Sequence, residues 1–413
     1  MQSLTILFLA ALAAMVAVRW WLATRQLAAL ARHRDQVPAA FAASISAAEH
    51  ARAANYTQAL LRLARLELVC GALLLLVVTL GGGFAALDAA CGRLGLSPVA
   101  HGVVTLAALS IAMAAADLPF DLWRTFHIEA RFGFNRTTPA LYAADLARSA
   151  ALGALLGLPL LAVLIALLGA AGPRWWLYAW VFWVACGLAV SLLWPRFIAP
   201  LFNRFRPLEP GPLHDAVVAV LGRCGFASDG VFVMDGSRRS AHGNAYFTGV
   251  GRHKRIVLYD TLVERLLPAE VEAVLAHELG HFRLHHVRQR LLFSFAAALA
   301  GFWLLGQAAA DPAFYTALGV PKPSAHAALA LFALVVPVVA FPLAPLASWW
   351  SRRHEYQADR FAVAHASASA LAAALVKLYR DNASTLTPDP LYSAWHDSHP
   401  PALLRIAALE RGG

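Results

Sequence analysis

The sequence has few charged residues and few cysteines for its length. Of its 413 residues, 14% are charged and 60% are apolar, and the mean hydropathy is +0.59. An ordinary soluble domain has about a quarter of its residues charged, so this composition excludes a standard cytosolic enzyme and equally a disordered chain. The 27 glycines and 22 prolines are too ordinary for a fibrous or low-complexity protein. We therefore expect most of the chain to lie in a lipid bilayer.

The four cysteines lie far apart in the chain and none belongs to a C-x-x-C pair; they are Cys70, Cys91, Cys186 and Cys224. This spacing argues against a disulfide framework and against a metal site made of thiolates. Any metal ion would have to be held by histidine and carboxylate side chains.

Seven stretches are long and apolar enough to cross a hydrocarbon core of about 30 Å, which takes about 20 helical residues. The short segment 172–174, Gly-Pro-Arg, separates two of them and predicts a tight antiparallel helical hairpin. The first stretch could also be a cleavable signal peptide, but residues 1–3 lack a basic side chain and Arg19 would interrupt it. The predicted spans are 4–23, 68–87, 103–122, 149–171, 175–195, 291–310 and 327–350.

Basic residues are distributed unevenly among the segments that alternate with these spans. Segments 24–67, 123–148, 196–290 and 351–413 hold 30 Lys and Arg residues, whereas the opposite side holds only Arg93, Arg174 and Lys322. By the positive-inside rule the N-terminus lies outside, and the long polar segments 196–290 and 351–413 lie in the cytoplasm. A basic face beside anionic lipid also accounts for the net charge of +10 without a nucleic acid partner.

Between the fifth and sixth spans the composition becomes that of a soluble module. Residues 231–234, 244–248 and 255–259 are short β-branched and aromatic runs, which predict three strands of a small sheet. A helix is expected next, because Pro268 suits its first turn and Glu270 favours its N-terminal end.

That helix carries HELGH at residues 277–281. An interval of four residues places the imidazoles of His277 and His281 on one face, where both can reach one ion. Glu278 beside them can take a proton from an attacking water and deliver it to a leaving amine. The alternative is a chance match to H-E-x-x-H, so the metal-site interpretation needs further support from the rest of the sequence.

A hydrolytic zinc site needs a third protein ligand. His285 and His286 are unsuitable as the third ligand, because residues 277–285 would span about 12 Å of continuous helix. Two roles stay open for them: a contact that supports the site or the substrate, or a polar position at the membrane boundary without a role in the site. Glu355 is the best donor. Asp359 follows four residues later, so one carboxylate can bind the ion while the other accepts the N–H of an imidazole ligand. A charged helix face at the lipid headgroups is the alternative.

In combination these features resemble the type I CAAX prenyl protease family, integral-membrane zinc metallopeptidases that cleave after a C-terminal prenylated cysteine in eukaryotes. Two positions depart from the family pattern: Asp397 stands where Tyr is usual, and Leu404 stands where Glu is usual before Arg405. The resemblance covers nearly the whole chain through FGFNRTT at 132–138, PLFN at 200–203, HGNAYF at 242–247, KRIVLYDTL at 254–262, HELGH at 277–281, Glu355 with Asp359, and HDSHPP at 396–401.

The resemblance implies roles at the metal site. His277, His281 and Glu355 would be the zinc ligands. Glu278 would be the general base, and Asp359 would support a ligating imidazole.

The resemblance also implies a substrate strand. A peptide would pair with Asn244-Ala245-Tyr246 by strand addition, and an ordinary edge strand is the alternative. We expect His399 to stabilise the oxyanion, with His396 as its rival.

We therefore expect a mainly α protein with seven transmembrane helices and a small α+β, gluzincin-like zinc peptidase module on the cytoplasmic face. Residues 1–204 would form a membrane domain of five helices, and residues 205–413 would form the peptidase domain with two more, at about 291–310 and 327–350. The expected activity is zinc-dependent endopeptidase cleavage of CAAX-type or other membrane-associated peptides, with one zinc ion per chain.

The expected partners are a peptide or membrane-protein substrate and the lipid bilayer, without nucleic acid or an obligate protein partner. The compact, Ala- and Arg-rich chain is typical of a bacterial inner-membrane protein, and bacteria generally lack protein prenylation. One alternative is therefore a broad-specificity quality-control metallopeptidase of the membrane. The other is a transporter or channel whose metal site is structural.

Overall fold

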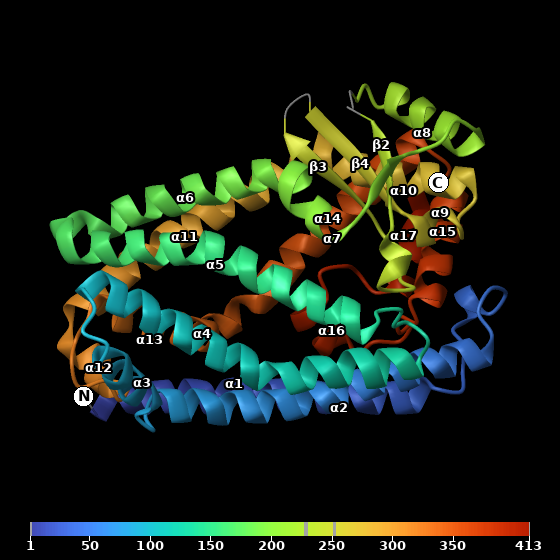
Figure 1. Cartoon of the computed structure of the whole chain (residues 1–413). Coiled ribbons are helices and arrows are strands. Elements are labelled where there is room, and N and C mark those ends of the chain that lie inside the picture. The colour runs from blue at the N-terminus through green and yellow to red at the C-terminus, as the bar shows by residue number, and fades with distance from the viewer. Residues whose placement is uncertain (1, 227–229, 251–252, 413) are drawn as a thin grey trace.

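The computed structural model describes residues 2–226, 230–250 and 253–412, in which a bundle of long helices carries a small sheet at one end (Figure 1). Shorter helices α3 (Gly83–Gly92) and α12 (Pro312–Ala317) lie with the N-terminus at the opposite end. The long helices are α1 (Gln2–His33), α2 (Ala47–Val78), α4 (Pro98–Trp123), α5 (Pro139–Ala170), α6 (Trp175–Leu193), α11 (His286–Ala310), α13 (Ala325–Ala340) and α14 (Ala344–His365).

The membrane spans agree with the prediction. Among the described residues, six helical segments are long and apolar enough to cross a membrane, or seven if the bent pair α2 and α3 counts as one span. A three-residue 3₁₀ turn, Gly172–Arg174, joins α5 to α6, as the predicted hairpin requires.

The predicted span 68–87 is not one straight helix. α2 ends at Val78, α3 begins at Gly83, and the two are bent by 53°. Gly82 has a φ of 75°, which is a left-handed conformation that favours glycine. A Cβ on Gly81 would lie 2.7 Å from the carbonyl oxygen of Val77. The glycine run therefore breaks the helix, whereas apolar length alone predicts a continuous one.

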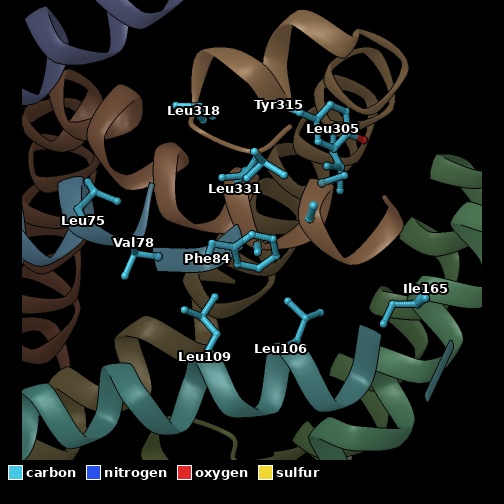
Figure 2. Packing of buried hydrophobic residues seen from close by; sticks show 14 of the residues in the cluster. Leu75, Val78, Phe84, Leu106, Leu109, Ile165, Leu305, Tyr315, Leu318 and Leu331 are labelled. Atoms are coloured by element: carbon cyan, nitrogen blue, oxygen red, sulfur yellow. The ribbon is translucent and has the colours of Figure 1, made fainter. Parts of the chain in front are cut away.

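A buried apolar cluster joins these helices and includes residues of α3 and α12 at the end opposite the sheet; Figure 2 shows part of its packing. It draws on α1 to α6 and on α11 to α13, so it fixes helices from both halves of the sequence against one another. The labelled members are Leu75, Val78, Phe84, Leu106, Leu109, Ile165, Leu305, Tyr315, Leu318 and Leu331.

Within the described residues the sheet has the strand order β1-β2-β4-β3. The predicted strands are confirmed as β2 (Val231–Met234), β3 (Ala245–Val250) and β4 (His253–Tyr259). β1 (Phe205–Pro207) was not predicted, because three residues ending in proline give no alternating pattern. β2 and β4 are parallel, and β3 pairs with β4 alone, which makes β3 an edge strand.

Helix α10 (Pro268–Arg283) follows the sheet and begins as predicted, with Pro268 in its first turn. Glu270 accepts a hydrogen bond from the Leu267 N–H at 2.8 Å and forms a 2.7 Å ion pair with Lys377. An apolar core packs α10 between the sheet, α14 and the helices α8 (Pro212–Arg223) and α15 (Ala368–Asp381). α10 is thereby packed against β3 and β4.

Candidate metal centre

Helices α10 and α14 carry the predicted ligands and approach each other at a glycine. A Cβ on Gly280 would lie 3.0 Å from the Cα of Ala358 and 3.1 Å from the Cβ of Phe361. These distances are shorter than normal contacts in a packed interior, so glycine is what permits the approach. The same approach sets Glu355 of α14 opposite the imidazoles of α10.

The structure brings His277, His281 and Glu355 together. The Nε2 atoms of the two histidines are 3.2 Å apart. The Glu355 carboxylate oxygens lie 3.4 Å from Nε2 of His277 and 3.2 Å from Nε2 of His281. One ligand atom from each of the three residues therefore lies within 4.8 Å of the other two.

These residues fit a metal ion. Oε2 of Glu355 is fully buried and has no hydrogen-bond partner among the described residues, which is costly for a charged oxygen. A divalent cation between the carboxylate and the two facing nitrogens would remove that cost. Two imidazoles and one carboxylate are also a donor set that hydrolytic zinc sites use.

Asp359 and Arg405 form a second layer behind His277. Oδ1 of Asp359 lies 2.8 Å from Nδ1 of His277. Arg405 donates two hydrogen bonds of 2.7 Å to the same carboxylate, and both side chains are buried. With Nδ1–H donated to Asp359, the Nε2 lone pair of His277 faces Glu355, as a metal ligand requires.

His286 supports the other imidazole. The sequence excluded it as a ligand by assuming a continuous helix, but α10 ends at Arg283, and His285 has a φ of 59°. The chain turns there, and Nδ1 of His286 comes within 3.0 Å of Nδ1 of His281. Nε2 of His286 lies 2.9 Å from Oε1 of Gln357. His286 thus contacts the side of His281 that faces away from Glu355, whereas His285 is exposed.

Glu278 lies half-buried beside the cluster. It lines a cavity of about 460 Å³ together with His277, His399 and Ala245 of β3. Burial raises the pKa of the Glu278 carboxyl, and the neighbouring His277 and His281 oppose this rise without cancelling it. A carboxylate with a raised pKa is a stronger base near neutral pH.

The edge strand β3 borders the same cavity through Ala245, and Asn244, which precedes the strand, borders it too. Tyr246 instead lines a separate pocket beside Trp194, because successive side chains of a strand point to opposite faces. The Asn244 carbonyl accepts the Tyr259 N–H at 3.0 Å, so the N–H of Ala245 points toward the free edge. The side-chain Oδ1 of Asn244 accepts that N–H at 2.8 Å.

His399, rather than His396, reaches the cluster. Nε2 of His399 lies 3.5 Å from Oε2 of Glu355, and its side chain is 61% exposed. The His396 ring packs on Tyr392 at 4.4 Å between centroids. The structure thus brings His399 to the predicted ligands and leaves His396 outside the cavity that Glu278 lines.

Comparisons with known proteins match both parts of the chain. Residues 26–204 match a family model described as the CAAX prenyl protease N-terminal domain with five membrane helices, and residues 207–412 match peptidase family M48. The chain is 38% identical to the CAAX prenyl protease 1 homolog of Arabidopsis thaliana over 77% of this chain and 76% of that protein. It is 35% identical to CAAX prenyl protease 1 of Saccharomyces cerevisiae over 76% of this chain and 73% of that protein.

A solved structure matches over the whole fold. The crystal structure of S. mikatae Ste24p superimposes with a TM-score of 0.91 at 30% sequence identity and covers 98% of both chains. The match includes the membrane helices as well as the module that holds the histidine and glutamate cluster. The chain therefore belongs to the CAAX prenyl protease 1 family of peptidase family M48, a family of membrane metalloproteases.

Proposed function

We propose that the protein is a zinc endopeptidase that cleaves CAAX-type peptides at a membrane surface. The observation that carries the proposal is the convergence of His277, His281 and Glu355 beside Glu278 at one cavity. Zinc held by these three residues would polarise the scissile carbonyl and lower the pKa of an attacking water toward about 7.

Glu278 acts as the general base. It takes a proton from the attacking water and delivers it to the nitrogen of the leaving amine. Its half-buried position next to two imidazoles supports this role, since burial raises the pKa of its carboxyl toward the range in which proton transfer in both directions is efficient.

The supporting residues fix the ligands before substrate arrives. Asp359, itself held by Arg405, orients His277, and His286 orients His281. Such partners raise the basicity of imidazole ligands and define their tautomers. His399 donates an N–H toward the oxyanion, and its largely exposed ring lines the same cavity as Glu278.

The substrate peptide adds to β3 as a further strand. Its carbonyl would accept the outward N–H of Ala245, which requires the Asn244 side chain to release it. Ala245 borders the cavity that also holds Glu278, so a peptide on this edge would pass the catalytic carboxylate.

CAAX-type peptides are the proposed substrates because the similar proteins are named CAAX prenyl protease 1. The distribution of basic residues supports a cytoplasmic position for the peptidase module. A bacterial inner membrane remains an expectation from composition alone.

Substitution of Glu278 tests the catalytic proposal. In purified full-length protein, Glu278→Gln should lower cleavage of a farnesylated CAAX peptide at least 100-fold, while zinc content stays unchanged. Glu264→Gln is the matched control, because Glu264 is exposed on the same module, and it should leave both quantities unchanged. If Glu278→Gln cleaves normally with zinc bound, the metal site is structural, as in a transporter or channel.

Substrate preference requires a second comparison. The wild-type protein should cleave the farnesylated peptide faster than the same peptide without its lipid. Preference for unmodified or misfolded membrane substrates would favour the quality-control alternative.

A further inference from the structure

A second cluster of metal-ligating side chains lies at the end of the bundle opposite the sheet. Asp88 comes from α3, His101 from α4 and His326 from α13, and these helices meet near the N-terminus of the chain (Figure 1). One ligand atom from each of the three residues lies within 4.8 Å of the other two. None of them takes part in the chemistry assigned to α10 and α14.

The donor atoms converge. Nε2 of His101 and Nε2 of His326 lie 2.9 Å and 2.8 Å from the same oxygen, Oδ1 of Asp88. The hydroxyl of Ser324 lies 3.2 Å from Nε2 of His326, and the backbone carbonyl of Asp88 lies 3.1 Å from Nε2 of His101. Five nitrogen and oxygen atoms therefore surround one small region.

The surrounding chain is shaped to hold these rings. A Cβ on Gly102 would lie 3.0 Å from the Cβ of His326 and 3.1 Å from its Nδ1, so a glycine at this position leaves room for the imidazole. His326 is buried, and Phe84 covers it with a ring 6.3 Å away. Asp88 and His101 keep side-chain exposures of 26% and 23%, so the cluster is not completely enclosed by protein.

We propose that Asp88, His101 and His326 form a second metal site that binds a divalent transition-metal ion such as zinc. Two imidazoles and a carboxylate suit zinc and its neighbours, whereas Mg²⁺ and Ca²⁺ prefer oxygen donors alone. Among the described residues, neither His101 nor His326 is followed in the sequence by a glutamate as His277 is followed by Glu278, so we assign the site a structural role. The ion ties α3, which follows the break after α2, to α4 and α13.

The alternative is a metal-free network in which both imidazoles donate an N–H to Asp88. Metal counting separates the two. Full-length protein in detergent is saturated with zinc, passed through a desalting column and analysed by mass spectrometry. Two zinc ions per chain are expected for the wild type, one for His326→Asn and two for His214→Asn, a control on an exposed histidine of α8.

Variants at each site make the result unambiguous. Glu355→Gln should lose the zinc ion between α10 and α14 and keep the ion at Asp88, His101 and His326. The two variants therefore show separately whether each site binds zinc. Asp88→Asn removes a charge while keeping the side-chain shape, and it should weaken binding of Co²⁺ at this site at least tenfold by absorption titration. Equal zinc counts in wild type and His326→Asn, or unchanged Co²⁺ binding in Asp88→Asn, would overturn the proposal.

Discussion

Replacement of Gly280 by alanine tests whether the contact between α10 and α14 sets the metal site. The new methyl group would lie 3.0 Å from the Cα of Ala358, so α14 has to move away by a few tenths of an ångström. Zinc sites tolerate about 0.2 Å of error in their ligand distances. Since Glu355 lies on α14, Gly280→Ala should weaken zinc binding at least tenfold, which corresponds to about 1.4 kcal/mol.

The effect of Gly280→Ala on stability should be limited, because two contributions oppose each other. Overpacking costs about 1–3 kcal/mol, but alanine gains about 1 kcal/mol over glycine in a helix interior. The metal-free variant should therefore lose no more than about 2 kcal/mol of unfolding free energy. Competition with a chelating dye measures the zinc affinity, and thermal unfolding without metal measures the stability.

Gly222→Ala in α8 is the matched control for this experiment. A Cβ there would meet nothing within 4 Å, so zinc affinity should stay at the wild-type value and stability should not fall. Gly280→Ala with wild-type zinc affinity and peptidase activity would refute the reasoning, because the two helices would then not need to lie so close.

Three further predictions follow from the same geometry. Arg405→Met leaves the buried carboxylate of Asp359 without its bidentate partner and should lower the free energy of unfolding by about 3–5 kcal/mol; a wild-type midpoint in denaturant would contradict this. His286→Phe keeps a ring against His354 but removes the nitrogen that faces His281, so zinc affinity should fall about 10- to 100-fold. The control is His285→Asn, a substitution of the exposed neighbouring residue, which should bind zinc as the wild type does. Because burial raises the pKa of Glu278 above its ordinary value of 4.5 and the base must be ionised, kcat/KM should fall as pH is lowered through that raised pKa; an acid limb at or below 4.5 is the contrary result.

Much of the peptidase module could be predicted because its signals are local. Pro268 and Glu270 mark the start of α10 by their backbone preferences. The four-residue intervals in α10 and α14 place pairs of side chains on one helix face. Proximity between the two helices is not local: the sequence could name Glu355 as the best third donor because Asp359 follows it by four residues, but its distance from the histidines is a result of the tertiary structure.

The features that escaped prediction depend on backbone conformation. The left-handed residue His285 ends α10 and returns the ring of His286 to His281, and no composition signal marks it. The break at Gly82 divides a stretch that is apolar enough to be one span. Strand β1 is too short to show a period, and it exists because it pairs with β2.

The hydrogen bond from Ala245 to the side chain of Asn244 has a consequence for selectivity. An exposed strand edge favours pairing between identical molecules, which leads to aggregation. Here the N–H of Ala245, which a foreign strand would need as a donor, is already hydrogen-bonded to Asn244. Replacing that hydrogen bond with one to a foreign carbonyl therefore gains almost no free energy. Stable binding must then come from contacts made by the side chains of the incoming peptide, so extended segments without such contacts should bind weakly.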